Sequence, residues 1–148
     1  MWNHLKSLTL SIFCTRLFAA LLTIGVIAAP WIVNWYFGDG FTAQALHIPF
    51  RVTFYVCAVP GYILLYCLYI LLKNVRVGIV FDNQNTKMLR IISWSCIGVG
   101  VITFVSGFFY MSFFLVAVAS TFFALIIRVI KNVFEQAIEI KSENDFTI

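Results

Sequence analysis

The sequence predicts an all-α fold: a polytopic membrane protein with a four-transmembrane-helix bundle and a cytoplasmic amphipathic C-terminal helix. Three observations support this prediction: the composition, the lengths of the uncharged windows and the placement of Lys and Arg. Of the 148 residues, 62% are hydrophobic and only 11% are charged, against about 45–50% and about 25% in soluble domains. Because so short a chain cannot hide this apolar surface in its own core, the composition excludes an ordinary soluble domain, a disordered chain and a nucleic-acid-binding module.

The uncharged windows mark the spans, since a charge at the centre of a bilayer costs at least about 2.5–3.5 kcal/mol. Windows 17–38 and 52–72 hold 22 and 21 residues, and a spanning helix needs about 20. Window 91–127 holds 37 residues; as one helix it would be about 55 Å long, so it is expected to fold back near Tyr110. The single domain, 1–148, thus has spans at about 14–37, 52–72, 91–109 and 112–130, an outer loop 38–51, an inner loop 73–90 and a tail 131–148.

The positive charges predict the orientation. With four spans, only Arg51 of the ten Lys and Arg residues falls on the outer side. The nine on the inner side are Lys6, Arg16, Lys73, Arg76, Lys87, Arg90, Arg128, Lys131 and Lys141. Because Lys and Arg are enriched in cytoplasmic loops, both termini are expected in the cytoplasm. The first span has the basic start of a secretory signal, but its apolar run continues past Pro30, which favours an uncleaved signal-anchor.

The two longer loops are expected to carry some helical structure. In the outer loop, Phe41 to His47 are expected to form one or two interfacial helical turns that stop before Pro49. In the inner loop, Asp82 or Asn83 is expected to cap an amphipathic lead-in to the third span.

Small residues predict where the helices touch, since helices in lipid associate by close packing. The third span carries five residues spaced three or four apart, on one helical face: Ser93, Cys96, Gly100, Thr103 and Gly107. The fourth span carries Ala117, Thr121 and Ala124 at similar spacing. A short hairpin makes these spans antiparallel neighbours, so the two small faces are expected to meet.

The second span carries a tyrosine stripe and a proline that is expected to kink it. The stripe consists of Tyr55, Tyr62, Tyr66 and Tyr69, and Pro60 lies within it. The simpler interpretation is hydrogen bonding within the bundle and anchoring at the interface. The alternative is a kinked, polar-lined pocket whose tyrosines face an amphiphile.

No recognisable motif predicts catalysis, a cofactor or a metal site. The cysteines, Cys14, Cys57, Cys67 and Cys96, form no Cys-x-x-Cys pair and are expected to act as small apolar residues. The sequence has no Gly-rich phosphate loop and no nucleophile-base pattern. No ionisable residue lies deep in a predicted span, which is unlike most ion-coupled transporters. We therefore expect a protein that is not an enzyme and has no cofactor.

The fourth span is expected to continue beyond the membrane as an amphipathic helix. Arg128, Lys131, Glu135 and Glu139 step by 3, 4 and 4 along one face, and Lys131 and Glu135 can pair at i,i+4. This segment is either a solvated helix end or a docking surface for a cytosolic partner or for the protein's own inner loop.

The sequence ends in Glu143-Asn144-Asp145-Phe146-Thr147-Ile148. This segment looks like a Glu-Asn-Asp-Leu-Thr-Ile-type tail, with Phe in place of Leu, and the chain thereby resembles a bacterial four-span membrane protein family of unknown function (DUF2975-like). The segments Gly78–Phe81, Asn85 and Leu89–Ile91 are similar to its inner loop, so the resemblance covers about Val75 to the end and the first half by hydropathy only. It implies a bacterial cell-membrane protein with cytoplasmic termini, often encoded beside a helix-turn-helix regulator, and it implies no activity.

Two hypotheses about function follow. Phe146 and Ile148 alternate with Asp145 and Thr147, which favours a tail that folds back on the inner loop with its acids near Lys87 or Arg90. The leading hypothesis is a membrane sensor or regulatory anchor for a cytosolic factor, such as a helix-turn-helix regulator. Its candidate partner or tail-docking residues are Phe81, Asn85, Arg90, Glu143, Asn144 and Asp145.

The alternative belongs to a different class of protein. It is an immunity or resistance factor, or a small oligomeric transporter, that engages an amphiphile through the second span. The lipid bilayer and further copies of the chain in a homo-oligomer complete the expected partners, and no direct nucleic-acid binding is expected.

Overall fold

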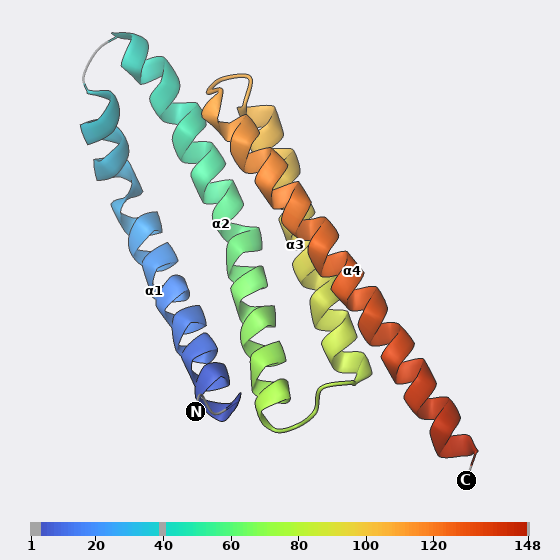
Figure 1. The fold of residues 1–148 in the computed structure, drawn as a ribbon. Helices are drawn as coiled ribbons and strands as arrows, with labels where there is room; N and C mark the ends of the chain where they lie inside the picture. The colour runs from blue at the N-terminus through green and yellow to red at the C-terminus, as the bar shows by residue number, and fades with distance from the viewer. Residues whose placement is uncertain (1–3, 39–40, 148) are drawn as a thin grey trace.

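The computed structural model describes residues 4–38 and 41–147, and every regular element within them is a helix (Figure 1). The helices are α1 (His4–Phe37), α2 (Phe41–Arg76), α3 (Asn83–Ser106) and α4 (Ser112–Phe146). Each is long and apolar enough to cross a membrane. The four-span prediction is therefore confirmed, including the fold-back of the third uncharged window.

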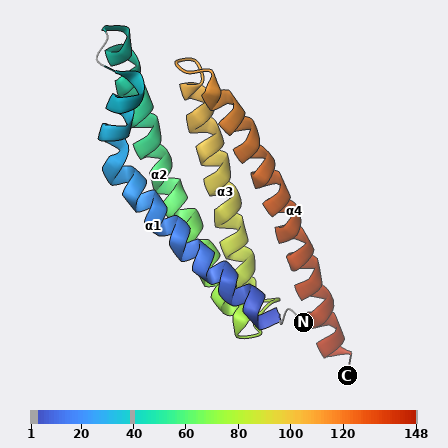
Figure 2. The same ribbon diagram turned by 60° about the vertical axis from the view of Figure 1, so that its left-hand side comes forward.

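The four helices stand side by side in chain order. α1 packs on α2, α2 on α3 and α3 on α4, and within the described ranges no other pair packs backbone against backbone. Figures 1 and 2 show the start of α1, the α2–α3 loop (77–82) and the end of α4 at one end of the bundle, and the α3–α4 turn at the other. We call these the basic end and the hairpin end. Since α1 and α4 each have one packed neighbour, most of their surface is left for lipid.

The core lies around α3, where the predicted small faces meet. The five small residues of α3 are buried, as are Ala117 and Ala124 of α4. A Cβ built on Gly100 would lie only 2.7 Å from Oγ1 of Thr121, and the Ser93 hydroxyl donates a hydrogen bond to the Ala124 carbonyl at 3.0 Å. The predicted contact between the third and fourth spans is therefore confirmed.

Pro49 lies inside α2, so the prediction that the helical turns stop before it is wrong. A proline removes one backbone donor and crowds the preceding turn, but a chain in lipid has no water to satisfy the other backbone groups, so helix is kept on both sides. The Thr53 hydroxyl donates to the Pro49 carbonyl at 2.7 Å and contacts the Ser106 hydroxyl of α3 at 2.6 Å. Together these bonds anchor this part of α2 to α3.

The inner loop is shorter than the predicted range 73–90, because helix extends into it from both sides. Gly78 ends α2 with a positive φ of 89°, while the amides of Gly78 and Ile79 donate to the carbonyls of Val75 and Asn74. This is the Schellman arrangement, which glycine favours because it has no Cβ. At the start of α3, the Asp82 side chain accepts a hydrogen bond from the amide of Gln84, so the predicted N-cap is confirmed for Asp82.

Polar contacts join α1 and α2 near the hairpin end. Arg51 donates to the Asn34 side-chain oxygen at 2.5 Å and to the Pro30 carbonyl at 3.3 Å. Its Nε and the Nε2 of His47 are buried without a hydrogen-bond partner. The ring of His47 packs against Phe37, with ring centroids 5.5 Å apart. Arg51, the single cation predicted on the outer side, is thus held against α1.

Candidate functional site

Asn85 joins three segments at the basic end through side-chain hydrogen bonds, which we call the Asn85 clip. Its side-chain amide donates to the carbonyls of Ile79 and Val80, both at 2.8 Å, and its oxygen accepts from Asn74 at 2.8 Å. The side chain is 0% exposed. Asn85 therefore holds the α2–α3 loop against the ends of α2 and α3, and it has no accessible surface; its role in partner or tail docking stays a prediction.

The α2–α3 loop packs against α4 through an aromatic pair. The rings of Phe81 and Phe134 lie with centroids 5.4 Å apart and an interplanar angle of 54°. Phe81 remains 49% exposed, so it contacts α4 on one side and offers its other side to the surroundings. The structure thus brings the predicted residue Phe81 to the junction between the loop and α4.

An ion-pair network fixes the same junction. Glu135 accepts from Arg90 at 3.2 Å and from Lys131, one turn earlier on α4, at 2.9 Å. The i,i+4 pair predicted from the sequence is therefore confirmed. Glu135 lies beyond the predicted fourth span, and the hydrogen bond from Lys131 holds the pKa of its carboxyl below the ordinary value, with Arg90 adding to the effect.

The predicted fold-back of the tail is not observed. α4 continues as one helix to Phe146, the side chains of residues 139–147 are exposed, and Phe146 itself is 90% exposed. Ile148 lies outside the described residues. Glu143, Asn144 and Asp145 are exposed on the last turns of α4, and α4 instead meets the loop through Phe134 and meets Arg90 of α3 through Glu135.

A basic cleft opens between α3 and α4, just inside this junction. A cavity of about 110 Å³ is lined by Arg90, Ser93, Trp94, Arg128 and Lys131. The guanidinium of Arg128 stacks over the Trp94 ring at 5.6 Å from its centroid. The sequence pattern placed Arg128 on one helical face with Lys131, Glu135 and Glu139, and it did not connect Arg128 with Trp94. The signal was present, because the two residues lie at similar distances along the chain from the turn at Tyr110.

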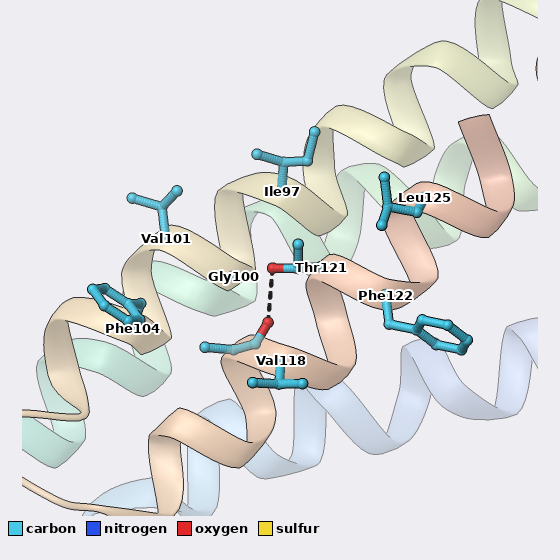
Figure 3. Close-up of a pocket in the computed structure, with 9 residues that line it drawn as sticks. Ile97, Gly100, Val101, Phe104, Val118, Thr121, Phe122 and Leu125 are labelled. Atoms are coloured by element: carbon cyan, nitrogen blue, oxygen red, sulfur yellow. Dashed lines mark hydrogen bonds between the residues drawn. The ribbon is translucent and has the colours of Figure 1, made fainter. Parts of the chain in front are cut away.

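Next to this cleft, an apolar groove follows the α3–α4 interface (Figure 3). Its volume is about 620 Å³, and its walls carry large side chains from both helices. Thr121 lies beside Gly100 at the floor, and its hydroxyl donates to the Ala117 carbonyl of its own helix at 2.8 Å. The lining residues are Ile97, Gly100, Val101, Phe104, Ala117, Val118, Thr121, Phe122 and Leu125.

Part of the tyrosine stripe lines a second cavity, between α1 and α2. Tyr62, Tyr66 and Tyr69 line this cavity of about 260 Å³ together with Arg16 and others, whereas Tyr55 does not. Arg16 donates to the Tyr69 hydroxyl at 3.0 Å, and the Tyr62 hydroxyl contacts that of Thr23 at 2.9 Å. Tyr62 and Tyr69 thus form hydrogen bonds between α1 and α2, and an amphiphile facing the stripe stays a prediction.

These sites present cations, a carboxylate and hydroxyl groups. Within residues 4–38 and 41–147, no three His, Cys, Asp or Glu side chains are grouped to hold a metal ion. The four cysteines carry free thiols. The charged groups instead present cations and carboxylates at the basic end, where helices α3 and α4 hold them in fixed positions.

Comparison with known proteins gives one match. Residues 41–148 match the model of a family described as “Protein of unknown function (DUF2975)”. The matched range includes α2, α3 and α4, and so covers the α2–α3 loop, the junction with α4 and the basic cleft. No curated protein and no solved structure gives a significant match.

Proposed function

The chain belongs to the DUF2975 family of proteins of unknown function, and we propose that it works by binding, as a membrane sensor or regulatory anchor for a cytosolic factor. It is not an enzyme in this proposal. The membrane domain holds the protein in the bilayer, and the end of α4 presents the binding surface.

One observation carries the proposal: α4 runs past the α2–α3 loop as an exposed, charged helix with no partner among the described residues. Its total length of 35 residues corresponds to about 52 Å, far more than a hydrocarbon core of about 30 Å. This exposed end carries carboxylates together with the apolar side chains of Ile140 and Phe146, which lie open to a partner. At the start of this segment, Phe134 contacts Phe81 of the loop and Glu135 pairs with Arg90 of α3.

The same proposal places the protein in a bacterial cell membrane with both termini in the cytoplasm. The support is the positive-inside rule together with the arrangement of the helices, in which the start of α1, the α2–α3 loop and the end of α4 share one end (Figure 1). The bacterial assignment follows from the family resemblance of the sequence.

The partner we propose is a basic cytosolic protein, with a helix-turn-helix regulator as the leading candidate. Glu139, Glu143 and Asp145 are exposed on the last turns of α4. Carboxylates on an exposed helix suit the cationic surface of a DNA-binding protein, because complementary charges steer association. A conformational change in the membrane domain would move the exposed end of α4 through the contacts of Phe134 and Glu135. A homo-oligomer is compatible with the proposal, since α1 and α4 each leave a face free in the lipid.

Photo-crosslinking in bacterial cells tests this function. A photoreactive residue at Glu143 should capture a cytosolic protein, whereas the same residue at Phe123, exposed on α4 within the predicted fourth span, should not. Reversing the charge at Glu139 and Asp145 should abolish the capture from Glu143. Equal capture at both positions, or capture that survives the charge reversal, would contradict the proposal.

A second candidate function rests on the cavity between α1 and α2. Arg16 at its edge and the tyrosine hydroxyls suit an amphiphile with an anionic or hydrogen-bonding head, as expected for an immunity or resistance factor or a small oligomeric transporter. Tyr66 is 67% exposed and has no role in the helix contacts described above, so Tyr66→Ala should lower amphiphile binding without unfolding the protein. Tyr55→Ala, outside the cavity, provides the control.

A further inference from the structure

The basic cleft between α3 and α4 carries more positive charge than its own carboxylate neutralises. Arg90, Arg128 and Lys131 line it, while the carboxylate that pairs with two of them is Glu135. Among the described residues, the contact found for the Arg128 guanidinium is the Trp94 ring, which is no anion. Lys131 can donate three hydrogen bonds and Arg90 five, so both retain donors after pairing with Glu135. The cleft therefore offers an anion a net charge of about two positive units, from groups that are already positioned.

The residues that line the cleft and those that line the apolar groove of Figure 3 follow one another along α3 and α4. On α3, Arg90 and Trp94 line the cleft, and Ile97 and Val101 line the groove one and two turns further along. These residues lie within less than a quarter of a turn of one another, given 3.6 residues per turn. On α4, Leu125 of the groove lies one turn from Arg128 of the cleft. One continuous surface thus joins a polar site to an apolar channel.

The dimensions of this surface fit one leaflet of a bilayer. From Trp94 in the cleft to Phe104 in the groove, the combined surface runs about 15 Å along α3, which is half of a hydrocarbon core of about 30 Å. Trp side chains are enriched at the level of lipid headgroups. The cations therefore lie at the depth of the phosphates, and the groove lies at the depth of the acyl chains.

We propose that the α3–α4 surface is a binding site for a single anionic phospholipid. Arg90, Arg128 and Lys131 bind the phosphate and the anionic headgroup, as basic pockets between transmembrane helices do. One acyl chain lies in the groove over Gly100, between the side chains of Val101 and Val118. Lipid binding at this site does not require a cytosolic partner, so the lipid site is tested independently of the proposed function. Because Lys131 also binds Glu135, the lipid would bear directly on the junction of α4 with the α2–α3 loop.

Native mass spectrometry of the full-length protein in neutral detergent tests the site. Phosphatidylglycerol should bind with one saturable site and more tightly than phosphatidylcholine of the same chain length. Arg128→Gln should weaken phosphatidylglycerol binding about fivefold, which corresponds to about 1 kcal/mol for one cation, while Arg128→Lys should retain most of it. Arg76→Gln removes an exposed cation at the same end but outside the cleft, and should have no effect.

A second pair of variants tests the groove. Val118→Trp fills it from α4 and should weaken phosphatidylglycerol binding, whereas Val116→Trp, exposed on α4 outside the groove, should not. Circular dichroism and thermal unfolding of each variant check that the fold is intact. Equal affinity for the two lipids, equal losses for Arg128→Gln and Arg76→Gln, or no effect of Val118→Trp would overturn the proposal. Displacement of the lipid by millimolar inorganic phosphate would instead assign the cleft to a free anion and overturn the lipid site.

Discussion

The contact between Gly100 and Thr121 makes Gly100→Ala the sharpest test of how α3 and α4 pack. The added Cβ would lie 2.7 Å from Oγ1 of Thr121, 3.2 Å from Oγ of Ser120 and 3.5 Å from the Ala117 carbonyl oxygen. A separation of 2.7 Å is closer than real Cβ contacts, so a neighbour has to move. The Thr121 hydroxyl is tied to the Ala117 carbonyl at 2.8 Å, and its movement would cost that bond or push the helices apart.

The magnitude follows from comparing two glycines of the same helix. Gly98 has no atom within 4 Å of its Cβ position, so Gly98→Ala should leave stability unchanged or raise it by up to about 1 kcal/mol through helix propensity. Gly100→Ala has the same propensity gain and, in addition, an overpacking cost of about 1–3 kcal/mol. The difference between the two variants isolates this cost, and we expect Gly100→Ala to be less stable than Gly98→Ala by about 1–3 kcal/mol.

The assay is reversible unfolding in mixed micelles, with both variants measured beside the wild type. Thr121→Ala removes the closest obstructing atom, so the double variant with Gly100→Ala should recover part of the loss. Equal stability of Gly98→Ala and Gly100→Ala would refute the close packing of the two small faces. Failure of Thr121→Ala to recover any stability would show that the obstruction lies elsewhere.

Two further predictions concern the basic end. Asn85→Ala leaves the carbonyls of Ile79 and Val80 without their donor, so the free energy of unfolding should fall by about 2–3 kcal/mol and limited proteolysis should cut residues 77–82 sooner; unchanged protease resistance would contradict the clip. The pKa of Glu135 is lowered by its hydrogen bond from Lys131, so its contribution is present above the ordinary carboxyl pKa and is lost as the pH falls through the lowered value. Hydrogen exchange of residues 131–137 should therefore speed up on acidification beyond the intrinsic pH effect in the wild type but not in Glu135→Gln, and identical pH profiles would count against the network.

The positions of the four helices and the packing face of α3 could be predicted from the sequence. Charges are excluded from the hydrocarbon core, so the uncharged windows located the four spans and the turn near Tyr110. Spacing on a helix is periodic, so the small residues around Gly100 identified the face that packs on α4. Both inferences depend on short-range regularities, and neither requires knowledge of how distant segments meet.

The parts that escaped prediction depend on such distant contacts. The pairs Phe81–Phe134 and Arg90–Glu135 join residues about 50 positions apart, and many other pairings were equally compatible with the sequence. The alternation at the end of the chain predicted a tail folded on the loop, yet four residues of alternation are too few to separate an extended segment from a helix. The end of the chain is helical because it continues α4, and each residue added to an existing helix gains one hydrogen bond.

We propose that the four helices cross the membrane and leave the charged end of α4 in the cytoplasm. Thiol labelling of intact bacterial cells with a membrane-impermeant reagent tests it most directly, in a variant whose four cysteines are replaced by alanine. A cysteine at Ala45, near the hairpin end, should be labelled from outside, whereas a cysteine at Ser142 should be labelled only after the cells are permeabilised. Labelling of the Ser142 position in intact cells would contradict the topology, and with it the binding of a cytosolic partner by α4.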